Sequence, residues 1–404
     1  MNNIFRNSLF LFLIRIATLG FPIFIIPLLI SRIGLSNYGI TAYYTAFFSF
    51  FVIFINFGFD ESATKKIAKN NFGKITKKQY VASVLSIKIV LSVLIFITVL
   101  LYYLLIEKNN YLLFFSLLIF VEAINCLWFF QGIEKIEYIS ISTTFSKIIY
   151  IFLIYIFVKE QDDTILVPIF LALAGVMSNV YPFIKLCKLS EIDKSSFNFK
   201  NIYFIFKDSL PIFWTNFIPS LKDKIGTLIL GNITTMDIVA IYDIVIKFLN
   251  LLFIPINILN SAFFPELSKN REKDTLYKLF RLSICYSIIV ILFVCLLSGI
   301  IFDYKFSKYV QYENIIKLIS ITVIFYSVSV IIAKNILIVI GEYGYVIKSL
   351  IIVTAIYLIS SFSLVYFNEV SILNLTLLTV LCFFIEMLIR IYFCIKNKFL
   401  HLFN

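Results

Sequence analysis

Long apolar runs alternate with short polar segments along the whole chain. A helical membrane span needs about 20 mostly apolar residues. Runs of that length are predicted at roughly 9–31, 40–59, 80–106, 111–133, 139–158, 165–187, 210–230, 238–264, 284–302, 316–340, 346–367 and 373–395. The runs are continuous and do not alternate residue by residue, which favours helices over a β-barrel. The pattern therefore predicts an all-α polytopic membrane protein with twelve transmembrane helices.

Composition supports this class. Hydrophobic residues make up 61% of the 404 residues and charged residues 14%, against roughly 25% charged residues in an average soluble domain. A water-soluble fold could not cover so much apolar surface with so few charges. The six cysteines form no CxxC pair and the one histidine, His401, lies three residues from the end. The sequence therefore suggests no metal-ligand cluster and no cofactor.

The basic residues indicate an orientation. The formal net charge is +12, but the basic residues lie in short segments between apolar runs, so a nucleic-acid partner is not expected. If the N-terminus is cytoplasmic, the predicted cytoplasmic segments hold 21 Lys and Arg residues and the outer segments hold five. Cytoplasmic loops of membrane proteins carry this excess of positive charge. Both termini are therefore expected in the cytoplasm.

Two halves of similar length resemble each other. The matching pairs are Asn7-Ser8-Leu9 with Asp208-Ser209-Leu210, Ile67-Ala68-Lys69-Asn70 with Leu267-Ser268-Lys269-Asn270, and Asn125 and Gly132 with Asn335 and Gly341. Their order predicts a parallel internal repeat of two six-helix bundles, an arrangement of transporters whose substrate site lies between the halves. The expected division is 1–187, a cytoplasmic linker at 188–209, and 210–404. The alternative is that apolar sequence of biased composition aligns with anything.

Ionisable residues inside the apolar runs are the candidates for function. A charge at the bilayer centre costs about 2.5–3.5 kcal/mol on insertion scales, so such side chains should face a cavity or a partner. The candidates are Arg15, Lys88, Glu122, Lys147, Lys222, Asp223, Lys224, Asp243, Lys247, Lys334, Glu386 and Arg390. Eight are cations and four are anions, so the predicted interior is net cationic.

Each candidate has a structural alternative. Arg15, Lys88, Lys334 and Arg390 could extend their charged ends to the membrane surface. The pairs Asp243/Lys247 and Glu386/Arg390 are spaced i, i+4 and could neutralise each other on one helix face. Glu122 suits a proton or cation carrier, because burial disfavours the charged form of a carboxylate; alternatively it pairs with Lys147 or Lys88.

Lys147 and the cluster Lys222-Asp223-Lys224 lie near the middle of their spans, where they cannot easily reach the surface. Pro219, just before the cluster, predicts a bend that frees backbone groups toward a cavity. The predicted substrate-binding residues are Arg15, Lys88, Lys147, Lys222, Lys224 and Lys247. The predicted ion-coupling residues are Glu122, Asp223 and Asp243.

A polytopic membrane protein of this kind could be a transporter, a membrane enzyme or an ion channel. A transporter of an anionic substrate fits the cationic interior. A membrane enzyme needs a catalytic constellation, usually on a long loop, and the sequence offers neither a long outer loop nor a GxSxG motif. An ion channel needs a selectivity filter, which no segment resembles. We therefore expect a transporter and no catalytic residues.

Several motifs resemble those of a known family. They are Ser31-Arg32-Ile33-Gly34, Asn56-Phe57-Gly58-Phe59, Trp128-Phe129-Phe130-Gln131-Gly132-Ile133-Glu134-Lys135 and Phe264-Pro265-Glu266-Leu267-Ser268. Together with the twelve predicted spans, these motifs resemble those of O-antigen flippases of the Wzx type, within the multidrug/oligosaccharidyl-lipid/polysaccharide exporter superfamily. The similarity extends over essentially the whole chain.

The resemblance implies a bacterial inner-membrane protein that works by alternating access. Its substrate would be an undecaprenyl-pyrophosphate-linked oligosaccharide, with membrane lipid around it and a proton or sodium ion as the coupling ion. Lys and Arg are natural phosphate binders, so a cationic lumen suits the pyrophosphate. The alternatives are a flippase for another lipid-linked glycan, such as a capsule or teichoic precursor, and a multidrug exporter. The last is disfavoured because such exporters bind cations.

Overall fold

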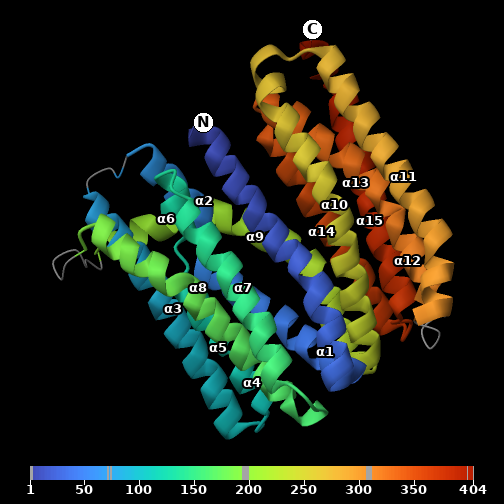
Figure 1. Ribbon diagram of the computed structural model, residues 1–404. Helices are drawn as coiled ribbons and strands as arrows, with labels where there is room; N and C mark the ends of the chain where they lie inside the picture. The colour runs from blue at the N-terminus through green and yellow to red at the C-terminus, as the bar shows by residue number, and fades with distance from the viewer. Residues whose placement is uncertain are drawn as a thin grey trace. The chain divides into compact units, whose positions relative to one another are not determined.

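The computed structural model describes the backbone of residues 3–70, 72, 75–192, 200–305, 312–397 and 399–403. Helices make up almost all of these residues, and no strand occurs among them (Figure 1). Ten helices in this part of the chain are long and apolar enough to cross a membrane. The prediction of an all-α polytopic membrane protein is therefore confirmed.

The chain divides into two compact units. Unit 1 is Met1–Ser220 and unit 2 is Leu221–Asn404. The boundary lies inside helix α9 (Lys200–Ile233), which continues through Pro211 and Pro219 as one helix. The predicted division at 187 and 210 stays a proposal.

Unit 1 begins with a long kinked helix. Its helices are α1 (Asn3–Asn56), α2 (Phe59–Ala68), α3 (Lys77–Leu105), α4 (Asn110–Phe115), α5 (Leu117–Ala123), α6 (Leu127–Gly132), α7 (Glu137–Phe157), α8 (Leu166–Leu189) and the first part of α9. The first two predicted spans are joined within α1, where Gly34 has φ 82° and ψ 168°. Only glycine adopts such a conformation readily. The segment between the first two predicted spans, residues 32–39, is thus helical in the structure, with a kink at Gly34.

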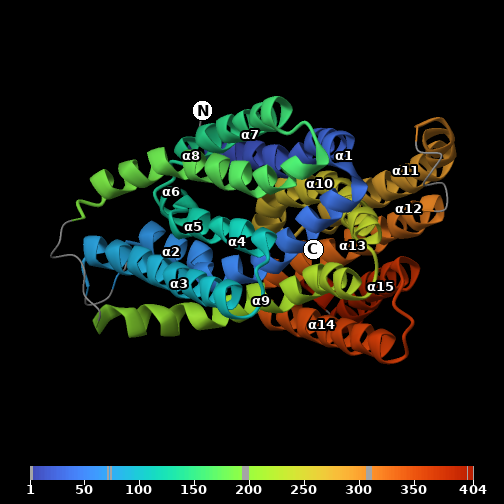
Figure 2. The ribbon, with the colours of Figure 1, turned by 90° about the horizontal axis from the view of Figure 1, so that it is seen from below.

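Unit 2 contains the rest of α9 and the following helices. They are α10 (Met236–Asn270), α11 (Lys273–Lys305), α12 (Glu313–Ser320), α13 (Thr322–Val330), the π-helical segment η4 (Ile331–Ile338), α14 (Tyr343–Tyr366) and α15 (Ile372–Lys396). Helices α14 and α15 pack along each other, as α7 and α8 do in unit 1 (Figure 2).

The fourth span of each unit is interrupted. The span predicted at 111–133 consists of α4, α5 and α6, and the span predicted at 316–340 consists of α12, α13 and η4. In unit 1 the Asn125 side chain helps to make the second break, because its Oδ1 accepts a hydrogen bond from the Leu127 backbone N–H at 3.1 Å. Asparagine side chains compete with helical hydrogen bonds in this way.

Two serines show that the units repeat the same local structure. Ser92 Oγ donates to the backbone carbonyls of Lys88 at 2.7 Å and Ile119 at 3.4 Å. Ser287 Oγ donates to the backbone carbonyls of Ser283 at 2.8 Å and Val323 at 3.4 Å. In both cases a serine on the third span bonds the residue four positions before it and a carbonyl on the fourth span. The internal repeat inferred from short sequence matches is thus visible in side-chain contacts.

The ten candidate spans agree with twelve crossings. The first candidate, Gly20–Ala68, contains the end of the first predicted span (9–31) and the whole of the second (40–59), on either side of the kink. Helix α9 corresponds to the seventh predicted span and does not qualify as a candidate. It carries Lys222, Asp223 and Lys224, and its mean hydropathy is accordingly low.

Apolar side chains cover the outward faces of the helices. Leu105 is 79% exposed, Leu296 is 73% exposed and Ile359 is 71% exposed. A soluble protein rarely shows so many large apolar side chains to water, so these faces suit contact with lipid. The cysteines differ in burial: Cys126, Cys382 and Cys394 are buried, whereas Cys285 and Cys295 are exposed.

Candidate functional site

The most connected polar site in the described part of unit 1 surrounds Lys88. The Lys88 side chain, on α3, is 0% exposed. Its Nζ donates to Asn56 Oδ1 at 3.0 Å, Glu122 Oε1 at 3.2 Å and the Asn125 carbonyl at 3.2 Å. Glu122 also accepts hydrogen bonds from Asn125 Nδ2 at 3.2 and 3.3 Å. An ammonium with three hydrogen bonds is fully satisfied, which makes its burial tolerable.

A second carboxylate joins this network at the junction of α1 and α2. Asn56 Nδ2 donates to Asp60 Oδ2 at 2.6 Å. Asp60 Oδ1 is buried, and the described residues offer it no hydrogen-bond partner. We call Asn56, Asp60, Lys88, Glu122 and Asn125 the unit 1 charge network. With one cation and two carboxylates, its net charge is −1 when all three groups are ionised.

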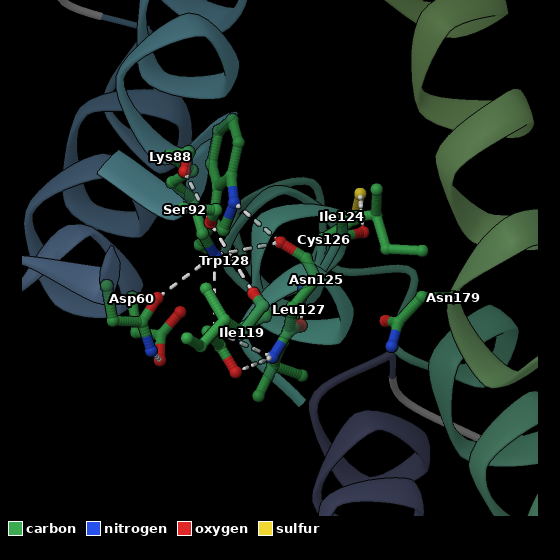
Figure 3. A network of polar contacts seen from close by, with 12 residues as sticks. Asp60, Lys88, Ser92, Ile119, Ile124, Asn125, Cys126, Leu127, Trp128 and Asn179 are labelled. Atoms are coloured by element: carbon green, nitrogen blue, oxygen red, sulfur yellow. Dashed lines mark hydrogen bonds and ion pairs between the residues drawn. The ribbon is translucent and has the colours of Figure 1, made fainter. Parts of the chain in front are cut away.

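Helix α6 holds the network against α2. The Trp128 indole Nε1–H donates to the Asn125 carbonyl at 3.2 Å, the same oxygen that accepts from Lys88 (Figure 3). Thr64 Oγ1 donates to the Trp128 carbonyl at 2.9 Å. Gly132 lies so close to α2 that a Cβ atom there would come within 2.8 Å of the Ile67 side chain. The motif around Trp128 therefore positions the Asn125 carbonyl.

In unit 2 a second charged cluster connects α15 with its neighbours. Arg390 Nη2 pairs with Glu386 Oε1 at 2.7 Å, so the expected i, i+4 pair forms. The same guanidinium donates to Ser329 Oγ at 2.7 Å and Ser349 Oγ at 3.1 Å. Lys222 Nζ, on α9, lies 3.4 Å from Glu386 Oε2. Two cations thus share one carboxylate, and the cluster has a net charge of +1.

Two predicted substrate contacts have no carboxylate partner among the described residues. Lys147, on α7, is half-buried and its Nζ lies 4.7 Å from the centre of the Phe21 ring, a cation–π contact. Lys224, on α9, is also half-buried, and the neighbouring Asp223 is exposed. These lysines differ from Lys88, whose charge is neutralised by its neighbours.

The remaining predicted residues lie in separate places. Lys247 Nζ pairs with Asp243 Oδ2 at 2.7 Å, so this i, i+4 pair also forms. Lys334 Nζ donates to Ser261 Oγ at 2.7 Å. The side chain of Arg15 lies outside the described residues. Lys222 and Arg390 share Glu386. Apart from this pair, the structure does not bring the predicted cations of a unit together in one cluster.

Sequence reasoning did not predict five members of these clusters as site residues: Asn56, Asp60, Asn125, Ser329 and Ser349. Asp60 and Asn56 lie at the end of an apolar run, where polar residues usually face the membrane surface, and Ser329 is one of many serines. Spacing gave no signal for this pair, because Asn56 ends α1 and Asp60 lies on α2, on either side of the turn at Phe57 and Gly58. The described residues hold no group of three or more His, Cys, Asp or Glu side chains that could bind a metal ion.

A family of known proteins matches most of the chain. The family described as polysaccharide biosynthesis protein matches residues 4–271. The chain belongs to this family. Two curated relatives of this chain are named as proposed O-antigen transporters. One, from Escherichia coli strain K12, is 25% identical over 282 residues, which are 67% of each chain. The other, from Shigella dysenteriae, is 24% identical over 380 residues, 90% of this chain and 93% of the relative.

Solved structures share the fold. An inward-facing multidrug resistance transporter of the MATE family, in the MOP superfamily, aligns with a TM-score of 0.73 and 12% identity over 95% of this chain and 94% of that one. A MOP superfamily transporter from Pyrococcus furiosus, described as having a binding pocket of reverse polarity, aligns with a TM-score of 0.65 and 12% identity, covering 98% and 95% of the two chains. At this identity the likeness shows the fold alone.

Proposed function

We propose that this protein is a flippase that moves an undecaprenyl-pyrophosphate-linked O-antigen oligosaccharide across the bacterial inner membrane by alternating access. The observation that carries the proposal is the match to a proposed O-antigen transporter over 90% of this chain. The protein would not be an enzyme, because moving the lipid-linked sugar breaks no covalent bond. Both termini would lie in the cytoplasm, as the distribution of basic residues predicts.

Cations within the spans support an anionic substrate. Lys147 and Lys224 lack a carboxylate partner among the described residues, and the cluster of Lys222, Arg390 and Glu386 has a net charge of +1. A pyrophosphate would supply the missing negative charge, and lysine binds phosphate as a compact point charge. Arg15, Lys88 and Lys247 remain proposed contacts. For Lys88 and Lys247, contact with substrate requires that their present ion pairs open.

Coupling to an ion gradient is the second part of the proposal. Glu122, Asp223 and Asp243 are the proposed ion-binding carboxylates, with a proton or sodium ion as the coupling ion. Glu122 has the strongest support, because it lies in the unit 1 charge network and contacts Lys88. Membrane carboxylates of this kind serve as relays in other transporters.

The proposal is tested by variants in a flippase-null strain that carries the matching glycan genes. Lys147→Ala and Lys222→Ala should each reduce surface O-antigen at least about tenfold, the effect of losing roughly 1.4 kcal/mol of binding. The corresponding Arg variants, which keep the charge, should retain more function. Lys348→Ala changes an exposed lysine in the first turns of α14 and is the matched control. Normal surface O-antigen with both Ala variants, at normal protein levels, would remove these lysines from the substrate site.

A flippase for another lipid-linked glycan is the alternative, because the family name specifies polysaccharide and no particular sugar. Complementation of strains that lack a capsule or teichoic-acid precursor flippase discriminates between these substrates. A multidrug exporter is less favoured, since a net cationic interior repels cationic drugs.

A further inference from the structure

The Lys88 ammonium lies where a bound metal cation would find ligands. Its Nζ contacts an amide oxygen of Asn56, a carboxylate oxygen of Glu122 and the backbone carbonyl of Asn125, all at 3.0–3.2 Å. Carboxylate, amide and backbone carbonyl oxygens are the ligands that hard cations take in proteins. The ammonium is therefore surrounded as an ion would be, but it is covalently attached to α3.

The Lys88 ammonium offsets part of the negative charge of the network. When Glu122 and Asp60 are both ionised, the net charge with Lys88 present is −1. Without it the net charge would be −2, in surroundings where Trp128 and Phe129 are 0% exposed. Uncompensated charges in such a buried place are strongly unfavourable. Asp60 Oδ1, which has no hydrogen-bond partner among the described residues, is a further oxygen near the site.

The corresponding place in unit 2 has neither the lysine nor the two carboxylates. Ser287 repeats the contacts of Ser92, so Ser283 corresponds to Lys88 and Tyr326 to Glu122. The sequence match of residues 67–70 with 267–270 pairs Asn260 with Asp60. In unit 2 Asn335 Nδ2 donates to Asn260 Oδ1 at 2.6 Å, and both side chains are buried. In the register of the two serines, Ser329 corresponds to Asn125, and its carbonyl accepts a hydrogen bond from Arg390 Nη1 at 3.1 Å. A cation thus donates to the corresponding carbonyl in unit 2 as well, but it comes from α15 and pairs with Glu386.

We propose that Lys88 is a tethered cation, whose ammonium fills a monovalent metal-ion site in unit 1 and excludes Na⁺ from it. Removing the ammonium would leave the oxygens of Asn56, Glu122 and Asn125 to bind Na⁺. One consequence rests on the proposed function: ions that couple transport at this network are protons. Glu122 and Asp60 can bind a proton while the ammonium stays in place, but Na⁺ cannot enter.

The test measures Na⁺ binding by the purified full-length protein in detergent. Trp128 reports on the site, because its indole and Lys88 share the Asn125 carbonyl, and Trp214→Phe removes the other tryptophan. In that background Lys88→Ala should show a saturable change of Trp128 fluorescence when Na⁺ replaces choline at constant ionic strength. Na⁺ at 100 times its Kd should also raise the melting temperature by about 5 °C. The protein with Lys88 intact should show neither effect.

Three further variants serve as controls. Lys88→Met fills the space with an apolar side chain and should not respond to Na⁺. Lys88→Ala combined with Glu122→Gln removes the charged ligand and should lose at least about tenfold in Na⁺ affinity, as removal of a charged partner implies. Ser283→Ala changes the corresponding position in unit 2 and should not create a response.

Two results would overturn the proposal. One is a specific Na⁺ response of the protein that retains Lys88, and the other is a folded Lys88→Ala variant that ignores Na⁺. If Lys88→Ala cannot be purified, Lys88→Ser introduces the residue found at the corresponding place in unit 2. Failure to recover either variant in Na⁺ would also contradict the proposal, since Na⁺ should replace the missing charge. No substrate is used, so these results are independent of whether the protein is a flippase.

Discussion

Lys88 and Lys147 are both lysines inside apolar spans, but their surroundings differ. Lys88 is fully buried and has two hydrogen-bonded side-chain partners and a backbone carbonyl, whereas Lys147 is half-buried against Phe21. Sequence position suggested the same role for both. The structure favours a structural and electrostatic role for Lys88 in this conformation and leaves Lys147 as the better proposed phosphate contact.

Replacing Lys88 should destabilise unit 1. Lys88→Met leaves Glu122 and Asp60 without a cation, and breaking a buried ion pair in this way typically costs about 3–5 kcal/mol. The melting temperature of the purified protein should fall accordingly. Adding Glu122→Gln removes one of the unpaired charges, so the double variant should be more stable than Lys88→Met alone. Equal or lower stability of the double variant would mean that the two side chains are not coupled.

The unit 2 cluster makes a parallel prediction. Glu386 is the carboxylate that Arg390 and Lys222 share, so Glu386→Gln should leave two nearby cations without compensation. We expect a loss of about 3–5 kcal/mol of stability, measured by thermal unfolding. Lys222→Met in the same protein should restore part of it, because it removes one cation. An unchanged melting temperature of Glu386→Gln would contradict this account of the cluster.

Among the helices, the two interrupted fourth spans show what hydrophobic pattern alone can and cannot predict. The apolar runs at 111–133 and 316–340 were correctly placed, since burial in lipid requires length and apolarity. The breaks at Asn125 and at η4 were not predicted, because they depend on local side-chain bonds and on tertiary contacts. The kink at Gly34 was also not predicted. The short segment between the first two apolar runs predicted a loop, but in the structure the helix continues and only Gly34 leaves the helical conformation.

Part of the candidate site was predicted, because an ionisable side chain inside an apolar run needs a partner. The positions of Lys88, Glu122 and Glu386 within apolar runs identified them as residues that need partners. Which partner each one finds depends on helices far apart in sequence, such as α3 with α5 and α9 with α15. Asp60 was overlooked because it follows an apolar run and does not interrupt one.

The close packing of α6 on α2 predicts a sensitive glycine. In Gly132→Ala the new Cβ would lie 2.8 Å from the Ile67 side chain and 3.1 Å from the Thr64 carbonyl. Forcing an atom into a packed interface costs about 1–3 kcal/mol, so the melting temperature should fall. Gly344→Ala is the matched control, since nothing lies within 4 Å of its Cβ position. Equal melting temperatures of the two variants would show that α6 and α2 are not packed as described.

At the scale of the whole molecule, α9 belongs to both units. Its first part contacts unit 1, where Ser209 Oγ lies 2.7 Å from Ser62 Oγ and Lys66 pairs with Asp208. Its second part belongs to unit 2, where Lys222 contacts Glu386. If the first part of α9 moves as one body with unit 1, the contact between Ser62 and Ser209 persists through the transport cycle.

A disulfide tests this description of α9. In a protein whose native cysteines have been replaced, Ser62→Cys with Ser209→Cys should crosslink on oxidation, because the two side chains already touch. We expect the crosslinked protein to retain most of its ability to restore surface glycan. Each single cysteine variant is a control for the substitution itself. Loss of function that returns on reduction would show that this contact must open during transport.

The central claim, that the protein moves a lipid-linked glycan across a membrane, is tested most directly in liposomes. Undecaprenyl-pyrophosphate-linked oligosaccharide is introduced in one leaflet, and its appearance in the other is followed with a membrane-impermeant glycan-modifying enzyme. Liposomes that contain the protein should transfer the glycan faster than empty liposomes, and Lys147→Ala should slow the transfer. Transfer no faster than in empty liposomes, with folded protein in the membrane and either a proton or a sodium gradient applied, would contradict the account.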